Sequence, residues 1–269
     1  MQSKDVLRKI VEDNKDNPNF YVRNLLREYL QVLILSYIYS SADYSSLFFY
    51  GGTCLKHCYD LPRLSEDLDF VDVEKSVSID SMARDVASFL EKESGIVVET
   101  KVQKFRIYFK FPILRELGMV SEEESDYLFV KTEVFSDFDF CTNFTEDFRP
   151  IFNFNHSFLV KTFDISTLMS IKIRAVLYRK WEKTTKNGKT LASVKGRDYF
   201  DLLWFLQKKV EPNYCCIEDV DDKETLKELL LEAVESADNK SIEYDLTNFV
   251  KSNIGSNLKK ALISTIKSW

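Results

Sequence analysis

The chain has 269 residues, 45% of them hydrophobic and 14% aromatic, with only seven glycines and five prolines. Such a chain forms one large domain or two smaller ones with a sizeable core, and its composition excludes a disordered or low-complexity protein. The formal net charge of −6 excludes a protein that coats nucleic acid non-specifically, because such proteins are basic overall. Any contact with nucleic acid must therefore come from a local basic patch.

The first half of the chain mixes helical and strand patterns, which indicates an α/β arrangement. Apolar periodicity predicts two helices within residues 4–41 and further helices at 53–59 and 78–93. Strands are predicted at 47–50, 68–73, 127–135 and 157–163, with two more paired as a hairpin within 95–114.

The second half reads as helical, with helices predicted at 166–180, 196–209 and 223–237 and one or two more near the C-terminus. We therefore expect an α+β protein in which a mixed sheet with helices, residues 1–160, precedes a helical C-terminal domain, residues 161–269.

Cysteine and histidine use argues against two common kinds of site. The five cysteines form no C-x-x-C pair, and the one partial cluster is Cys54, His57 and Cys58. Zinc binding is disfavoured, and buried small apolar side chains account better for these thiols. With only two histidines, a Ser-His-Asp hydrolase is also disfavoured. The start lacks an apolar signal core, and the run at 32–39 is too short to span a membrane, so we expect a cytoplasmic protein without membrane contact.

Asp67 and Asp69 stand two residues apart on a predicted strand, so both carboxylates lie on one face. Two adjacent carboxylates favour a cation between them, and Mg²⁺ prefers such oxygen ligands together with substrate phosphates. The same spacing recurs at Asp137 and Asp139. Only the first pair follows a glycine pair, and we therefore prefer it.

Gly51, Gly52 and Thr53 open the helix predicted just ahead of these acids. Free backbone N–H groups and the helix dipole at such a position can hold an anionic phosphate, and glycine allows close approach. The sequence thus predicts a phosphate cradle followed by a metal-binding strand.

Lys131 and Glu133 share one face of the strand at 127–135. Two interpretations stay open for this pair. It is an exposed ion pair of little energetic weight, or its strand lies beside Asp67 and Asp69, so that Glu133 adds a third metal ligand and Lys131 meets phosphate.

Lys172 has apolar neighbours one helical turn away on both sides, so it either extends past a core stripe or meets an anion in a cleft. Asp198 and Asp201 open a later helix on one face, and Arg197–Asp201 has the spacing of an i,i+4 pair. Helix-start electrostatics accounts for these residues, or they orient Lys172 or a substrate.

The stretch from Arg179 to Arg197 is the one local basic region, and Trp181 adds a stacking surface. It is either a solvated loop or a contact for RNA or phosphate. The candidate contacts are Lys180, Lys183, Lys186, Lys189 and Arg197.

In this order the motifs resemble those of the AbiEii-type (AbiEii/AbiGii) nucleotidyltransferase toxins, which belong to the DNA polymerase β-like superfamily. "GGTCLKHCYDLPRLSEDLDF" looks like the first motif, "VKTEVF" the second, "SIKIRAVLYR" the third and "RDYFDL" the fourth. The motifs span residues 50–202.

The resemblance implies a polymerase β-like nucleotidyltransferase core and an EC 2.7.7 enzyme that uses a nucleoside triphosphate with Mg²⁺ or Mn²⁺. It implies an abortive-infection or toxin–antitoxin toxin that modifies the 3′ end of tRNA, with a cognate antitoxin as partner. The alternatives are a nucleotide-binding or antitoxin-binding regulator without transfer, or transfer to a small-molecule hydroxyl or a protein.

The implied site residues match this sequence position by position. Asp67, Asp69, Lys172 and Asp198 would be catalytic, and Asp67, Asp69 and Glu133 would hold the metal. The nucleotide would meet Gly51, Gly52, Thr53, Ser65, Lys131 and Lys172.

Overall fold

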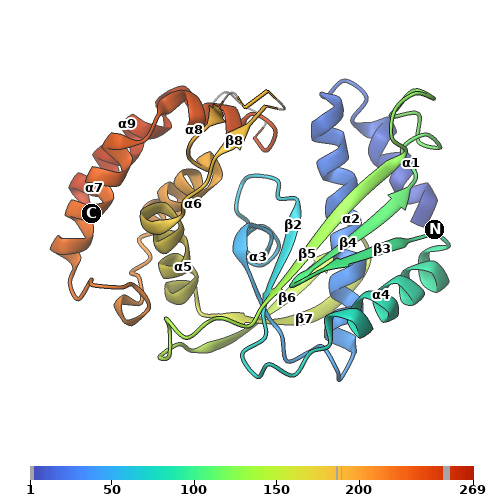
Figure 1. Cartoon of the computed structure of the whole chain (residues 1–269), viewed down its shortest axis with the longest axis horizontal. Coiled ribbons are helices and arrows are strands. Elements are labelled where there is room, and N and C mark those ends of the chain that lie inside the picture. The colour runs from blue at the N-terminus through green and yellow to red at the C-terminus, as the bar shows by residue number, and fades with distance from the viewer. Residues whose placement is uncertain (1–2, 186, 189, 251–254) are drawn as a thin grey trace. The chain divides into compact units, whose positions relative to one another are not determined.

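The computed structural model describes residues 3–185, 187–188, 190–250 and 255–269 (Figure 1). The chain divides into two compact units. The first comprises residues 1–60, 64–137 and 147–162, and the second 61–63, 138–146 and 163–269. Two short segments expected within the first domain, 61–63 and 138–146, thus cluster with the second unit.

The first unit is built on a seven-stranded mixed sheet with the strand order β3-β4-β5-β2-β1-β7-β6. Its strands are β1 (Phe48–Tyr50), β2 (Asp67–Val71), β3 (Glu99–Gln103), β4 (Arg106–Pro112), β5 (Tyr127–Phe135), β6 (Glu146–Asn153) and β7 (His156–Phe163). β2 pairs with β5 in parallel and with β1 antiparallel. The mixed sheet confirms the expected α+β class.

Helices cover one face of this sheet. The four helices of the unit are α1 (Ser3–Asp13), α2 (Asn19–Ser40), α3 (Gly51–Tyr59) and α4 (Ile79–Ser94). α2 contacts β5 and α4, and α4 contacts β3 and β4 (Figure 1). Strand residues that alternate with the charged ones point into this layer and are buried, among them Phe109, Phe111 and Val130. The opposite face of β4, β5 and β2 is left to polar and aromatic side chains.

The second unit is helical, and α6 (Gly196–Gln207) is its central element. The remaining helices are α5 (Ile165–Tyr178), α7 (Lys223–Ser236), α8 (Asn239–Leu246) and α9 (Gly255–Ser268). α6 contacts α5, α8 and α9, and every residue from Gly196 to Leu206 is buried. A Cβ atom at Gly196 would collide with the backbone of Ile242 in α8, so glycine permits this close approach.

Two strand pairs were not anticipated. β6 contains Pro150 and lies at the edge of the sheet, the position in which strands tolerate a residue without an N–H. Phe154 and Asn155 link it to β7 with positive φ angles of 48° and 62°. Inside the basic stretch, β8 (Lys183–Thr184) pairs with β9 (Thr190–Ala192).

The cysteines depart from the expectation that all of them act as small apolar side chains. Cys141 and Cys216, both buried in the second unit, form a disulfide, whereas Cys54, Cys58 and Cys215 are free. Their pairing had no local signal, because 75 residues separate them. Among the described helices, none has both the length and the apolar character that crossing a membrane requires.

Candidate active site

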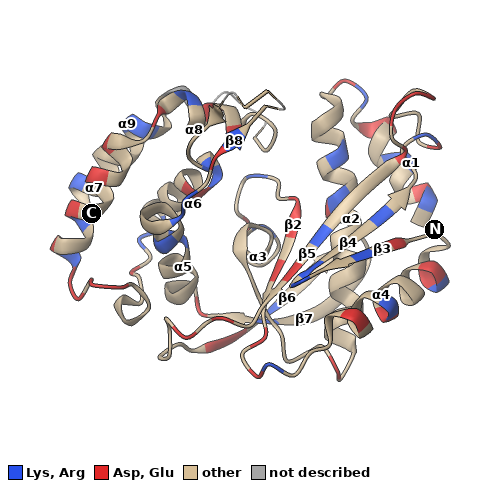
Figure 2. Cartoon of the chain, in the orientation of Figure 1, with Lys and Arg blue, Asp and Glu red and all other residues tan. Residues whose placement is uncertain are grey.

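Asp67 and Asp69 lie on β2 with their side chains on the same, half-exposed face, while Leu68 and Phe70 are fully buried on the other. The alternation of the strand produces this arrangement. Figure 2 shows acidic residues along β2 and both signs of charge along β5. The second Asp-x-Asp sequence is different: Asp137 and Asp139 are exposed and lie beyond the end of β5 in a segment without regular strand structure.

β5 lies directly beside β2, with Lys131 opposite Asp67 and Glu133 opposite Asp69. The Lys131 ammonium is 2.9 Å from the Asp67 carboxylate and 3.2 Å from that of Glu133. Arg106 on β4 also donates to Glu133. The two interpretations offered for this pair therefore both hold in part, because Lys131 and Glu133 form an ion pair and also lie next to the Asp67–Asp69 acids.

This electrostatic arrangement sets the protonation of Lys131. Burial works to lower the pKa of its ammonium group, but Asp67 and Glu133 outweigh that effect and raise the pKa above its ordinary value. Lys131 is therefore charged and balances the carboxylates around it.

The N-terminus of α3 meets Asp69. Tyr50, the last residue of β1, pairs with Asp69, and Gly51 then turns into the helix with a φ of +79°. A Cβ atom at Gly51 would overlap the Asp69 carboxylate, with the Asp69 Cγ at 3.1 Å. The first-turn N–H groups of a helix have no intrahelical acceptors, so this end of α3 offers donors beside the acids.

Two further predicted residues hold the acid-bearing strand. Thr53 is fully buried, and its hydroxyl donates to the backbone carbonyl of Asp67. Only the backbone N–H of Thr53 is then left for a phosphate. Ser65 lies just before β2, and its carbonyl accepts a 3.1 Å hydrogen bond from the buried Gln31 side chain.

The ligand types suit a divalent cation, because Asp67 and Asp69 present carboxylate oxygens on one face of β2, and the missing side chain at Gly51 lets the Asp69 carboxylate lie against the start of α3. Among the described residues, however, no group of three or more His, Cys, Asp or Glu side chains is arranged to hold a metal ion. Glu133 is directed to Arg106 and Lys131 instead, so its role as a third ligand stays a prediction.

Lys172 and Asp198 belong to the second unit, where they form a buried charged cluster. The Lys172 ammonium lies 2.8 Å from Asp198 and 2.9 Å from Asp201. Arg63 binds Asp201 through two 2.6 Å hydrogen bonds, and Arg179 reaches Asp198 at 2.7 Å. The anions that Lys172 meets are thus carboxylates of α6. The sequence motifs contained Arg63 and Asp201, but nothing local indicated that they pair.

The charges in this cluster stabilise one another. Burial works against the charged form of each group. It is outweighed at Asp198 by Lys172 and Arg179 and at Asp201 by Arg63 and Lys172, so that the pKa of each carboxyl lies below its usual range. The pKa of Lys172 is raised in turn, since Asp198 and Asp201 outweigh its burial.

Arg197 has the spacing of a pair with Asp201, but the structure pairs it with Asp245 instead, and its contact with nucleic acid stays a prediction. It is 9% exposed, its Nε lies 3.3 Å from Asp245, and its guanidinium stacks 4.0 Å from the Phe249 ring centre. Asp201 instead binds Arg63 and Lys172.

The other basic candidates are more accessible. Lys180 and Lys183 are exposed, and Lys180 lines a pocket of about 450 Å³ with Arg179, Trp181, Glu182 and Ser193. Lys186 and Lys189 fall outside the described residues.

A mixed sheet that carries paired carboxylates beside a glycine-led helix N-terminus, followed by a helical unit, defines the polymerase β-like nucleotidyltransferase class. Within that class, the chain belongs to the family of AbiEii nucleotidyl transferase toxins of type IV toxin–antitoxin systems, whose family model matches residues 33–261. This confirms the resemblance seen in the four motifs.

Solved structures support the fold. The chain is similar to MenT4, a nucleotidyltransferase toxin from Mycobacterium tuberculosis, with a TM-score of 0.56 and 13% identity over 96% of this chain and 88% of that one. It is also similar to JHP933 from Helicobacter pylori, with a TM-score of 0.50 and 15% identity over 91% and 90% of the two chains. At these identities the likeness establishes the fold. A search of curated protein sequences found no match.

Proposed function

We propose that this toxin transfers a nucleoside monophosphate from a nucleoside triphosphate to a hydroxyl at the 3′ end of tRNA. The hydroxyl oxygen attacks the α-phosphorus and loses its proton, a new P–O bond forms, and the bond to the departing pyrophosphate breaks. The observation that carries the proposal is the Asp67–Asp69 pair on β2, with Gly51 bringing the N-terminus of α3 onto Asp69.

Asp67 and Asp69 are the residues that would hold Mg²⁺ or Mn²⁺, with Glu133 as the predicted third ligand. Such a cation supplies charge neutralisation on the phosphates and on the oxygens that attack and leave. One of the acids also accepts the proton of the acceptor hydroxyl. In the described structure Lys131 provides the positive charge between Asp67 and Glu133.

The triphosphate is held by groups around these acids. The N–H groups of Gly51, Gly52 and Thr53 at the start of α3 have no acceptor within the helix, so they can donate to the phosphates. Ser65 adds a hydroxyl, and Lys131 adds a charged ammonium that the Asp67 carboxylate keeps in place.

For Lys172 and Asp198, in the second unit, we propose a catalytic contribution made through the residues that they position. Their burial and mutual pairing support a positioning contribution, because Asp198 also holds Arg179, whose side chain is 38% exposed. Arg179 then presents a fixed guanidinium to the pocket that contains Trp181.

The proposed tRNA acceptor rests on the basic stretch. Exposed Lys180 and Lys183 with Trp181 combine charges for phosphates and a ring for stacking, the pattern of single-stranded nucleic-acid binding. Triphosphates and tRNA occur together in the cytoplasm, where we place the protein, and a cognate antitoxin would restrain it there.

The direct test incubates the purified protein with each labelled nucleoside triphosphate, Mg²⁺ and total tRNA. We expect label on the tRNA 3′ end, and we expect Asp69→Asn to reduce transfer by about 100-fold or more, because it removes a metal-binding oxygen charge. The matched control is Asp139→Asn, the exposed acid of the second Asp-x-Asp sequence, which should transfer like the wild type.

The other outcomes have distinct meanings. Nucleotide binding without product under any triphosphate would indicate a nucleotide-binding regulator. Label on a protein or a small-molecule hydroxyl in a cell extract, with tRNA unlabelled, would reject the tRNA acceptor and keep nucleotidyl transfer. Equal transfer by Asp69→Asn and the wild type would reject the site.

A further inference from the structure

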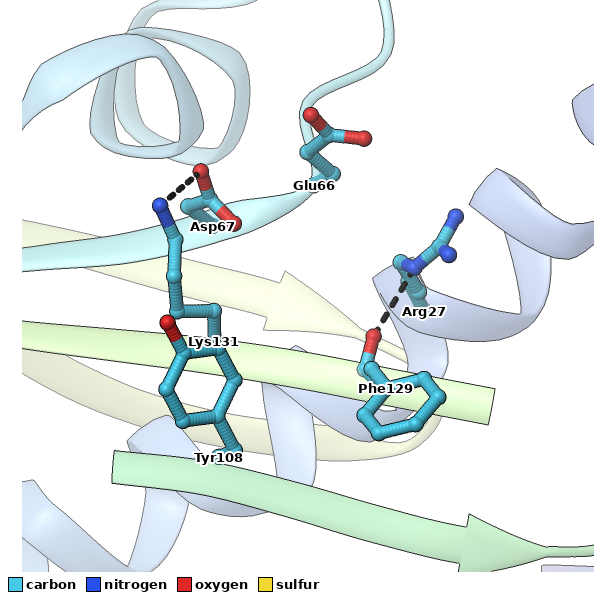
Figure 3. Close-up of a pocket in the computed structure, with 6 residues that line it drawn as sticks. All are labelled: Arg27, Glu66, Asp67, Tyr108, Phe129 and Lys131. Carbon is cyan, nitrogen blue, oxygen red and sulfur yellow. Dashed lines mark hydrogen bonds and ion pairs between the residues drawn. The ribbon is translucent and has the colours of Figure 1, made fainter. Parts of the chain in front are cut away.

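A pocket of about 430 Å³ opens next to Asp67 within the first unit (Figure 3). It extends from Asp67 toward the beginning of β5, and three of its lining residues, Arg27, Tyr108 and Phe129, lie outside the four sequence motifs. Its lining residues come from α2, the segment before β2, and strands β2, β4 and β5: Arg27, Glu66, Asp67, Tyr108, Phe129 and Lys131.

Two aromatic rings form the apolar part of this pocket. Phe129 lies on the same strand face as Lys131, two residues earlier, and Tyr108 pairs with Lys131 from β4. Phe129 is 40% exposed, although a large apolar side chain beside charged groups is costly to leave in water. An exposed ring at a pocket beside candidate catalytic acids is a surface on which a flat, partly apolar ligand can stack.

Arg27 and Glu66 form the polar part. The first residue of β2, Asp67, pairs with Lys131 of β5. Phe129 lies two residues earlier on β5, so its carbonyl lies beyond the start of β2 and has no partner on that strand. Arg27 takes that place and donates to the carbonyl from Nε at 2.9 Å (Figure 3). A second nitrogen of Arg27 donates to Asn24. Burial lowers the pKa of Arg27, and the nearby Glu66 and Asp67 charges oppose that effect.

The pocket is continuous with the phosphate end of the site, because Asp67 and Lys131 line it. Side chains two residues apart on a strand are separated by about 6.6 Å, so Phe129 lies roughly one such step from Lys131 along β5. A ligand with an anionic end at Lys131 and a flat end at Phe129 has the shape of a nucleoside phosphate.

We propose that this pocket binds the nucleobase and ribose of the nucleoside triphosphate, with Tyr108 and Phe129 as stacking surfaces and Glu66 and Arg27 as the groups that select the base. The assignment rests on the proposed function, and it adds the residues that decide which triphosphate is used. A carboxylate accepts from the base edge and a guanidinium donates to it, so the two discriminate between bases with different donor patterns.

The experiment measures equilibrium binding of the four ribonucleoside triphosphates, and of inorganic tripolyphosphate as a ligand without a nucleoside. We expect Phe129→Ala to weaken binding of the preferred triphosphate by about ten-fold, the loss typical of one stacked base. Affinity for tripolyphosphate should not change. Phe152→Ala is the matched control, because Phe152 is a more exposed ring, 76%, on β6 of the same unit and outside the pocket.

Glu66→Gln tests selection separately. It should change the ratio of affinities among the four triphosphates by at least about five-fold, since a base-edge contact of this kind discriminates between bases, and it should leave tripolyphosphate binding unchanged. Phe129→Leu keeps the bulk of the side chain and loses the ring, and it replaces Phe129→Ala if that variant does not fold.

Two results would overturn the inference. One is unchanged triphosphate affinity in folded Phe129→Ala and Glu66→Gln. The other is a raised KM for the acceptor in either of these variants while its triphosphate affinity is unchanged, which would assign the pocket to the acceptor. Failure of the proposed function is recognised separately, because in that case the wild-type protein itself transfers no nucleotide.

Discussion

Gly51 shows how a single residue connects backbone geometry to the chemistry of the site. Its φ of +79° is a conformation that residues with a Cβ rarely adopt, and a Cβ would also overlap the Asp69 carboxylate. The first property is shared with other glycines of the chain, but the collision with Asp69 belongs to Gly51. The absence of a side chain at Gly51 therefore allows the Asp69 carboxylate to lie against the N-terminus of α3.

We expect Gly51→Ala to reduce nucleotidyl transfer by about 10- to 100-fold, the usual effect of disturbing the support of a metal ligand, because the Asp69 carboxylate must move. Gly118→Ala is the control: Gly118 has a φ of +68° and nothing near its Cβ position. It should lose about 1 kcal/mol of stability for the positive φ and keep its activity. Steady-state transfer and thermal unfolding of both variants check this, and equal activity in both would contradict the role of Gly51.

At the scale of elements, α6 carries charged residues into the centre of the second unit. Asp198 and Asp201 are 2% and 0% exposed, which is tolerated only because Lys172, Arg63 and Arg179 pair with them. Their i,i+3 spacing places both acids on one helix face, as the sequence predicted. One lysine from α5 can therefore bind both and join the two helices.

Removing one member of this cluster should leave its partners buried without a counter-charge. We expect Asp201→Asn to lower the free energy of unfolding by about 3 kcal/mol or more. The control, Glu116→Gln, breaks exposed ion pairs with Lys4 and Arg8 and should change it by less than about 1 kcal/mol. Urea denaturation measures both, and similar losses in the two variants would show that the buried cluster carries no special stability.

The same cluster predicts a pH dependence. Folding lowers the pKa of Asp198, so its contribution to stability is present above the unfolded value of about 3.9 and is lost as the pH falls through the folded value. Folding raises the pKa of Lys172, so its contribution is present below about pH 10 and is lost as the pH rises through its folded pKa.

Unfolding free energies at pH 7 and pH 3 therefore provide a test. The wild-type protein should lose more stability between these pH values than Asp198→Asn, which lacks the titrating carboxyl. Acids outside this cluster contribute alike to both proteins, so their effect cancels in that comparison. If Asp198→Asn lost more unfolding free energy between these pH values than the wild type, folding would not lower the pKa of Asp198, and the pairing of this carboxylate with Lys172 and Arg179 would be rejected.

On the scale of the whole molecule, the chain passes between its two units more than once, and the segment 138–146 belongs to the second unit by contact. Phe138 stacks on Phe163 with ring centres 4.5 Å apart, and the Cys141–Cys216 disulfide joins the segment to the helical unit. A crosslink between distant positions restricts the unfolded chain and so stabilises the folded one.

We expect reduction of this disulfide, or the double variant Cys141→Ser with Cys216→Ser, to cost about 2–4 kcal/mol of stability. Peptide mapping of the unreduced, denatured protein should find Cys141 joined to Cys216 while Cys54, Cys58 and Cys215 react with an alkylating reagent. Alkylation of all five cysteines without prior reduction would disprove the crosslink.

Local sequence patterns were sufficient for most of the elements and for part of the site. Period-two alternation placed Asp67 with Asp69, and Lys131 with Glu133, on single strand faces, and the glycine pair marked the start of α3. β6 was not predicted because it contains Pro150, a residue that is rare within strands. The turn to its partner β7 runs through Phe154, which is not a typical turn residue. Arg197 was misassigned because the spacing to Asp201 suggested a helical pair, whereas its side chain binds Asp245 on α8.

The sequence by itself determined which residues could act together along one strand or one helix turn, since that depends only on the repeat of the backbone. Only the tertiary structure decided which elements are neighbours. It places β2 beside β5, brings Lys131 into an ion pair with Asp67, and positions Lys172 between two acids of α6. The pocket of Phe129 and Arg27 arose in the same way, from strands and a helix that only packing brings together. Contacts between distant segments depend on the burial of the whole core, which no short stretch of sequence encodes.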